Sequence, residues 1–163
     1  MNTYILAIDP GPAQSAVVTY GLSETDITAL ILDNDAVLAL LALDDKPEQS
    51  QVLLAVEMIA SYGMAVGKDV FETCVWIGRF IQAWTPREYR LVYRKDVKLH
   101  LCQSMRAKDS NIRQVLIDRF GKPGTKKNPG ATYGIAKDMW SALAVAVTAA
   151  ETEGAINGNR TSD

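Results

Sequence analysis

The sequence predicts one α/β domain in which helices cover a mixed β-sheet. Three short apolar strands follow one another near the N-terminus, a pattern typical of an antiparallel meander. Strands and helices then alternate, which adds parallel strands to the sheet. The length of 163 residues and the hydrophobic content of 48% suit a single packed core. We expect one folded domain over residues 1–153 and a flexible tail over residues 154–163.

The first half of the chain supplies the meander, a helix and a buried strand. Runs rich in Val, Ile and Thr end at turn residues such as Pro10-Gly11 and Gly21. An Ala/Leu-rich segment follows the third run and has a helical composition. The expected elements are strands over residues 4–8, 15–20 and 26–32, a helix over 35–43, and a strand over 51–56.

Helices dominate the second half. Residues 68–84 carry apolar side chains at helical spacing, and Pro86 lies just beyond them. Gly121 and Pro123 end a later helix and open a loop rich in Gly, Pro and Lys. The remaining expected elements are a strand over residues 88–93, short helices over 94–102 and 109–120, and a long Ala-rich helix over 135–151.

The charges are unevenly distributed. The formal net charge is −2, but residues 87–127 hold twelve Lys and Arg against four Asp and Glu. Residues 1–86 hold three basic and eleven acidic side chains. Such asymmetry indicates a molecule with one basic face, as nucleic-acid-binding proteins have. A solvated helix surface is the alternative interpretation of the same counts.

Several protein classes are disfavoured. No apolar run approaches the roughly 20 residues that a membrane span needs. The first residues lack the basic segment and cleavage site of a secretory signal. Cys74 and Cys102 have no metal-ligand spacing and are expected to be reduced, partly buried thiols. We therefore expect a cytoplasmic protein with no membrane partner.

Three carboxylates stand at element boundaries. Asp9 ends the first strand, Glu57 follows the fourth, and Asp138 opens the last helix. Singly, each also fits a structural role, in a turn, at a strand end or beside a helix dipole. Strand ends meet at one edge of an α/β sheet, and gathered carboxylates repel one another unless a cation lies between them. The trio therefore predicts a metal site that suits Mg²⁺.

The segments around these carboxylates resemble the RuvC-type Holliday-junction resolvases, especially their phage-encoded members. The similar segments are Ile-Leu-Ala-Ile-Asp-Pro-Gly at 5–11, Leu-Leu-Ala-Val-Glu at 53–57 and Asp-Met-Trp-Ser-Ala-Leu-Ala-Val-Ala at 138–146. The resemblance implies an RNase H-like fold and a homodimer that cuts branched DNA. It also implies two Mg²⁺ ions per active site, or Mn²⁺ in their place, bound by Asp9, Glu57 and Asp138. No nucleotide cofactor is expected, and the resemblance implies the cytoplasm of a bacterial or phage-infected bacterial cell.

The resemblance extends to basic residues. Val97-Lys98 and Ala107-Lys108 match a basic pattern of the family, so we expect Lys98 and Lys108 to act in catalysis by positioning the phosphate. Without the family, each lysine also fits a solvated helix. The residues expected to bind DNA are Arg94, Lys95, Lys98, Arg106, Lys108 and Arg113.

One position departs from the family pattern. Ser141 stands where the family usually has a fourth acidic residue. One interpretation is that three carboxylates suffice for catalysis and that Ser141 contributes a hydroxyl or holds an outer-shell water. Alternatively, the chain is a catalytically weak or inactive module that binds branched DNA. Asp69 and Glu72 are poor substitutes for the missing acid because they belong to the next helix.

Other residues carry weaker predictions. Met58, Tyr62 and Met64 follow the second carboxylate and are candidates to contact a junction or a partner subunit. His100 is expected to be a helix residue and not a catalytic base. RNase H activity on RNA–DNA hybrids and an ATP-dependent phosphotransferase are rival functions, but the chain lacks the length and second Gly-rich loop of the latter. Core or dimer-interface positions are expected for Phe71, Trp76, Phe80 and Trp84.

Overall fold

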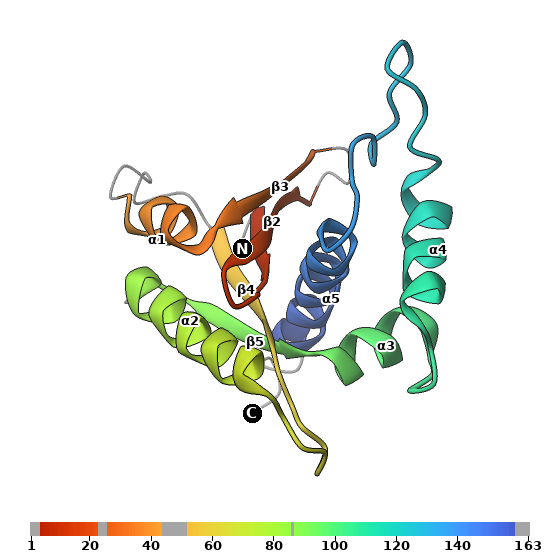
Figure 1. Cartoon of the computed structure of the whole chain (residues 1–163). Coiled ribbons are helices and arrows are strands. Elements are labelled where there is room, and N and C mark those ends of the chain that lie inside the picture. Colours follow the sequence, from red (N-terminus) through yellow and green to blue (C-terminus); the bar gives the residue numbers. More distant parts are fainter. Residues whose placement is uncertain (1–3, 23–25, 44–51, 86, 159–163) are drawn as a thin grey trace.

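Five strands form one mixed sheet. The computed structural model describes residues 4–22, 26–43, 52–85 and 87–158. The strands lie in the order β3-β2-β1-β4-β5 (Figure 1), with β1 antiparallel to β2 and parallel to β4. The predicted mixed sheet with three antiparallel first strands is confirmed. The strand bounds are β1 (Tyr4–Asp9), β2 (Gln14–Gly21), β3 (Ile27–Asp33), β4 (Val52–Met58) and β5 (Tyr89–Tyr93).

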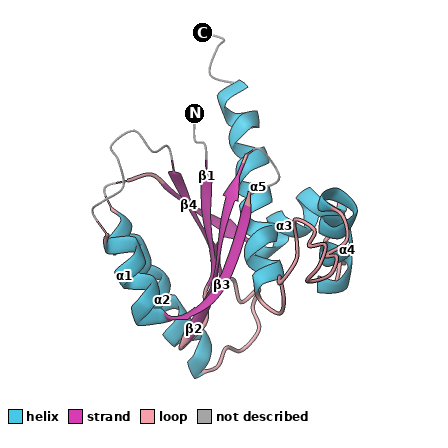
Figure 2. Cartoon of the chain, turned by 90° about the horizontal axis from the view of Figure 1, so that it is seen from above, coloured by secondary structure: helices cyan, strands magenta, loops and turns pink. Residues whose placement is uncertain are grey.

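Helices cover both faces of the sheet. Figure 2 shows α1 and α2 on one face and α5 on the other, with α3 and α4 beyond α5. None of the described helices has both the length and the apolar character that a membrane span requires. The helix bounds are α1 (Asn34–Ala42), α2 (Lys68–Trp84), α3 (Arg94–Cys102), α4 (Asp109–Phe120) and α5 (Met139–Gly158).

The period-2 alternation of the strands divides the core into two layers. Ile8 and Val56 point toward α1 and α2, where Phe80 and Trp84 are buried with them. Ala7 and Ala55 point toward α5. Residues 142–147 of α5 are fully buried, and their small Ala and Val side chains let the helix lie close to the sheet. The prediction of a core position is thus confirmed for Phe80 and Trp84.

The last helix differs most from its predicted range. It begins at Met139 and not at residue 135, because residues 131–138 form turns in which Gly134 and Lys137 have positive φ angles. It continues to Gly158, seven residues past the expected end, so residues 154–158 of the expected tail are helical. Residues 159–163 lie outside the described part of the chain. Cys74 and Cys102 are free and partly buried, as predicted.

A small hairpin projects beyond α4 (Figure 1). Thr125 and Asn128 exchange backbone hydrogen bonds, and the Gly130 N–H donates to the Pro123 carbonyl at 2.8 Å. A Cβ atom at Gly130 would lie 2.2 Å from the carbonyl oxygen of Lys122, so the hairpin requires glycine there. Its exposed tip carries Lys126 and Lys127.

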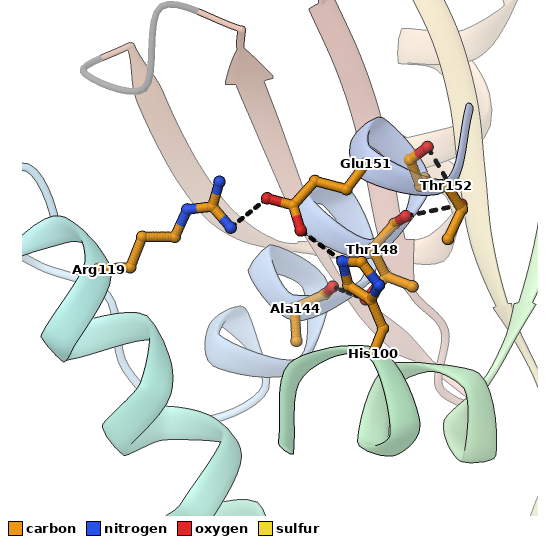
Figure 3. A network of polar contacts seen from close by, with 7 residues as sticks. His100, Arg119, Ala144, Thr148, Glu151 and Thr152 are labelled. Carbon is orange, nitrogen blue, oxygen red and sulfur yellow. Dashed lines mark hydrogen bonds and ion pairs between the residues drawn. The ribbon is translucent and has the colours of Figure 1, made fainter. Parts of the chain in front are cut away.

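Ionic contacts hold α3 and α4 against α5. The Glu151 carboxylate on α5 contacts the His100 ring on α3 and accepts from Arg119 on α4 (Figure 3). These two contacts lower the pKa of Glu151 although partial burial opposes them. His100 therefore lies in α3 with a structural contact, in agreement with its prediction as a helix residue.

Candidate active site

Asp9 and Glu57 lie side by side on neighbouring strands. β1 and β4 are parallel with Ile8 opposite Val56, so the two carboxylates that follow are adjacent. Ile8 and Val56 face α1 and α2, and the alternation of a strand turns the next side chains toward α5. Both acidic side chains are partly buried. The sheet therefore brings these two predicted site residues together on the face that carries α5.

Burial and mutual repulsion perturb both carboxyl groups. Burial first, and the negative charges of Glu57 and Asp138 next, raise the pKa of Asp9 to about 8. Burial also raises the pKa of Glu57, although the nearby Arg94 guanidinium opposes the rise. The side chains of Asp9 and Glu57 also interact with each other, which raises the pKa of Asp9 further and opposes the rise for Glu57. Paired carboxyl groups that retain a proton mark a place where a bound cation would be favoured.

A buried polar network fixes the turn that follows Asp9. The Gly11 N–H donates to Ser15 Oγ at 3.3 Å, and that hydroxyl donates to Asn34 Oδ1 at 2.6 Å. Asn34 Nδ2 in turn donates to the Gly11 carbonyl at 2.9 Å. Ser15 and Asn34 are almost fully buried, so each hydrogen bond is costly to break. The network therefore positions the chain on which Asp9 lies.

Asp138 lies nearby without joining the pair. It immediately precedes α5, where its carbonyl accepts from the Ala142 N–H at 3.0 Å, and its side chain is exposed. Its negative charge raises the pKa of both Asp9 and Glu57. Among the described residues, however, no set of three or more His, Cys, Asp or Glu side chains is arranged to hold a metal ion.

Arg94 occupies the space between these acidic groups. It is the first residue of α3, directly after β5, and its side chain is 25% exposed. Nη1 lies 3.7 Å from Glu57 Oε1 and 3.5 Å from Ser141 Oγ. Nη2 donates to the Asp109 carboxylate on α4. Arg94 was predicted to bind DNA, but the structure places it inside the candidate active site.

Two adjacent hollows share Arg94 as a wall. The first is lined by Asp9, Glu57 and Arg94, together with neutral residues of the segment after β4. The second lies toward α4 and the start of α5. Its lining consists of Arg94, Asp109, Ser110, Ile112, Arg113, Lys137, Asp138, Trp140 and Ser141. The site is thus open to a ligand on both sides of one guanidinium.

The overall structure is similar to that of RuvC. The Thermus thermophilus RuvC structure matches with a TM-score of 0.64 and 16% identity, over 93% of this chain and 96% of that chain. T. thermophilus RuvC in complex with a Holliday junction substrate matches with a TM-score of 0.57 and 14% identity, over 93% and 95%. The chain has the RuvC-type fold. By sequence, no protein-family model and no curated protein matches it.

Most predicted basic residues lie outside these two hollows. Lys98 is partly buried on α3, and Lys108 is exposed just before α4, where its N–H donates to Asn111 Oδ1 at 2.9 Å. Neither lysine is among the residues that line the hollows. Lys95 lies over the Tyr93 ring and Arg106 lines a separate groove between α3 and α4, whereas Arg113 lines the second hollow.

The RuvC-type fold also places residues at the site that the sequence did not single out. Asp109 pairs with Arg94, and Ser15 and Asn34 hold the turn after Asp9. Trp140 lines the second hollow with a buried Nε1 that has no hydrogen-bond partner among the described residues. Ser15, only four residues after Gly11, was a usable signal, but nothing local pointed to Asn34, Asp109 or Trp140.

Proposed function

We propose that this chain is a divalent-metal-dependent endonuclease that cuts four-way junctions and other branched DNA. The observation that carries the proposal is the adjacent pair Asp9 and Glu57 on a RuvC-type sheet, next to the start of α5. One solved structure of this fold is described as RuvC in complex with a Holliday junction substrate, which favours branched DNA as the substrate class.

The Asp9–Glu57 pair has the chemistry to bind a hard cation. Both groups offer oxygen ligands, and burial raises the pKa of both, so a divalent cation beside them would compensate a charge that burial disfavours. Mg²⁺ or Mn²⁺ bound there would activate a water for attack on phosphorus and stabilise the leaving oxygen. The chain's own part is to hold the two carboxylates adjacent, with Asp138 as a third at the edge of the site.

The basic segment supports a role in binding DNA. Three basic side chains on or between α3 and α4 are exposed: Lys95, Arg106 and Lys108. Lys98, also on α3, is partly buried. Lysine and arginine at such positions bind the phosphate backbone irrespective of base sequence. We expect Lys98 and Lys108 to approach the phosphate near the cut and the others to hold the DNA arms.

Exposed apolar residues on α2 favour a homodimer. Phe71 and Val75 are 62% and 63% exposed and lie one helical turn apart. Space is open around Gly78 at the next turn, so a second helix has access to this surface. Resolution of a four-way junction takes paired cuts, and a dimer supplies two active sites. Tyr62 and Met64, also exposed, remain candidates to contact the junction or the partner subunit.

A second candidate function is a DNA-binding module without catalysis. The observation that favours it is the pairing of Arg94 with Glu57 beside the neutral Ser141, which leaves fewer anionic ligands for metal. Such a module would bind branched DNA and leave it intact with any divalent ion.

A cleavage assay on defined substrates tests both candidates. Four-way junction, three-way junction, flap, duplex and RNA–DNA hybrid are incubated with Mg²⁺ or Mn²⁺ and wild type, Asp9→Asn or the control Asp69→Asn. We expect wild type and Asp69→Asn to cut branched DNA, while Asp9→Asn binds it without cutting. Equal cutting by Asp9→Asn contradicts the nuclease proposal, and binding without cutting by wild type identifies the module.

A further inference from the structure

The two hollows at the candidate active site have opposite charge. Asp9 and Glu57 face one guanidinium in the first hollow, and no other charged side chain among the described residues lines it. Arg94, Arg113 and Lys137 outnumber the two carboxylates in the second hollow, which are Asp109 and Asp138. A divalent cation is therefore favoured in the first hollow, and an anion is favoured in the second.

Arg94 is well suited to maintain this division. Its guanidinium keeps its charge at all accessible pH values and donates through several N–H groups in a fixed plane. Contacts with Glu57, Ser141 and Asp109 come from three different elements and restrain it between the hollows. The side chain is thus a permanent monovalent cation built into the wall of the site.

We propose that the site takes one divalent ion and one phosphate group: the ion binds at Asp9 and Glu57, and the hollow walled by Arg94 binds a DNA phosphate in place of a second ion. The inference rests on the proposed nuclease function. It differs from the two ions per site that the sequence resemblance implies.

Hydrogen-bond donors in the second hollow fit a phosphate. Trp140 is 6% exposed, and its Nε1–H has no acceptor among the described residues, although an unpaired buried donor is costly. The Arg113 guanidinium lies 5.0 Å from the centre of the Trp140 ring, so a second cation adjoins that ring in the lining of the same hollow. A phosphate offers several acceptor oxygens and satisfies such a group of donors at once.

A second metal ion fits this hollow poorly. It would have to displace Arg94 from Asp109 and would stand close to two further cationic residues, Arg113 and Lys137. Like charges at such separations repel strongly where water is partly excluded. Ser141 offers only a neutral hydroxyl, which already accepts from Arg94. The residues present therefore favour one ion, at the Asp9–Glu57 pair.

Two titrations of the metal-free protein test the inference. Calorimetry and electron paramagnetic resonance count the Mn²⁺ ions bound per chain. In a separate experiment, inorganic phosphate is added while the ¹⁵N–¹H signal of the Trp140 indole, assigned with Trp140→Phe, is followed by nuclear magnetic resonance. The variants are Arg94→Gln and the charge-matched control Arg79→Gln, whose side chain lies over Trp76 on α2.

We expect one Mn²⁺ per wild-type chain and a phosphate-dependent shift of the Trp140 signal. Arg94→Gln should weaken phosphate binding about tenfold or more, equivalent to the loss of a charge-assisted hydrogen bond, and Arg79→Gln should not. Two Mn²⁺ ions in wild type, or an unmoved Trp140 signal, overturn the inference; the second readout needs no variant, so misfolding of Arg94→Gln cannot obscure it.

The proposed function is tested separately by junction cleavage. A wild-type chain that cuts junctions but binds two ions contradicts only the inference. Absence of cutting on every branched substrate contradicts the proposed nuclease whatever the ion count, and absence of any bound Mn²⁺ contradicts both.

Discussion

The carboxyl groups of Asp9 and Glu57 lie side by side on the face of the sheet that carries α5, where burial and the charge of Glu57 raise the pKa of Asp9. Parallel pairing of β1 with β4 makes them neighbours, and burial makes two full negative charges unfavourable. The pair therefore retains a proton in the metal-free chain at neutral pH. Stability and metal binding should both depend on that proton.

Asp9→Asn should stabilise the metal-free protein increasingly as pH rises. The folded-state pKa of Asp9 is about 8 and its ordinary value is 3.8, so the folded chain binds more protons between these pH values. Stability is then fully present below about pH 4 and is lost as pH rises toward 8. Asparagine does not ionise, so the variant should not lose stability in this way as the pH rises. A melting temperature higher by about 4 °C or more at pH 8 corresponds to roughly 1–2 kcal/mol.

Differential scanning calorimetry with a chelator at pH 5 and pH 8 measures this effect. The control variant is Asp69→Asn, which removes an exposed carboxylate of α2 outside the candidate active site. An Asp9→Asn difference that is the same at both pH values would show that Asp9 ionises normally.

Binding of a divalent ion should release about one proton per ion at pH 7, because the ion replaces the proton held by the Asp9–Glu57 pair. Titration calorimetry with Mn²⁺ in buffers of different ionisation enthalpy measures the number of protons released. A binding heat that does not depend on the buffer argues that both carboxylates are already ionised. Asp9→Asn should bind Mn²⁺ at least about tenfold more weakly, as expected for loss of a charged ligand.

Much of the fold followed from local patterns. Short apolar runs identified the five strands of the sheet, and the helical spacing of residues 68–84 matched α2 at both ends. The start of α5 was misplaced because residues 131–138 have no apolar period of their own, and the positive φ at Lys137 depends on its surroundings. The hydrophobic pattern fixes which residues are buried, but turns between elements depend on tertiary contacts.

The site was only partly accessible from sequence. Asp9 and Glu57 end apolar strands, and that boundary position was visible. Arg94 was visible only as one charge in a basic segment, because Asp109 and Ser141 lie 15 and 47 residues away along the chain. Sequence spacing carries no information on such pairings, since they arise from the packing of α3, α4 and α5.

Glu151→Gln should destabilise the packing of α3 and α4 on α5. The carboxylate contacts His100 and Arg119, and both contacts lower its pKa (Figure 3). Its contribution is present above the ordinary value of 4.5 and is lost as pH falls through the lower folded-state pKa. The carboxylate is partly exposed, so solvent screening limits the effect to a few degrees in melting temperature at pH 7.

The measurement is thermal unfolding of Glu151→Gln and wild type at pH 7 and pH 3. The difference between them should shrink at the lower pH. A difference that persists unchanged at pH 3 would assign the loss to packing and not to the charge.

Lys98→Gln and Lys108→Gln should differ from Lys95→Gln in their effect on cutting. If the first two lysines position the phosphate near the cut, each loss should lower the cleavage rate about tenfold or more. Lys95, exposed beside Tyr93, should affect only binding. Each lost phosphate contact should reduce the salt dependence of log K by roughly 0.9. Single-turnover cleavage measures the effect on the rate of cutting. Junction binding between 50 and 200 mM salt, a range of roughly fourfold, measures the effect on affinity. Equal cleavage rates in all three variants would show that Lys98 and Lys108 do not act in catalysis.

Phe71→Lys should convert the proposed homodimer into monomers. The side chain is exposed on α2, and Val75 one turn later is exposed as well, so neither residue supports the core of its own chain. A charge buried at a helix–helix interface costs several kcal/mol unless it is paired. Sedimentation velocity should therefore show a monomer. Thermal unfolding of this monomer should give a melting temperature close to that of the wild type.

The comparison variant is Arg79→Ala on the same helix. It removes a positive charge and places no charge on the apolar surface formed by Phe71 and Val75. It should remain dimeric. Monomeric Phe71→Lys should still bind a four-way junction but should nick it once instead of cutting two strands together, because one active site is present per bound chain. A wild-type chain that is monomeric at all concentrations, or a dimeric Phe71→Lys variant, places any dimer contact away from this part of α2.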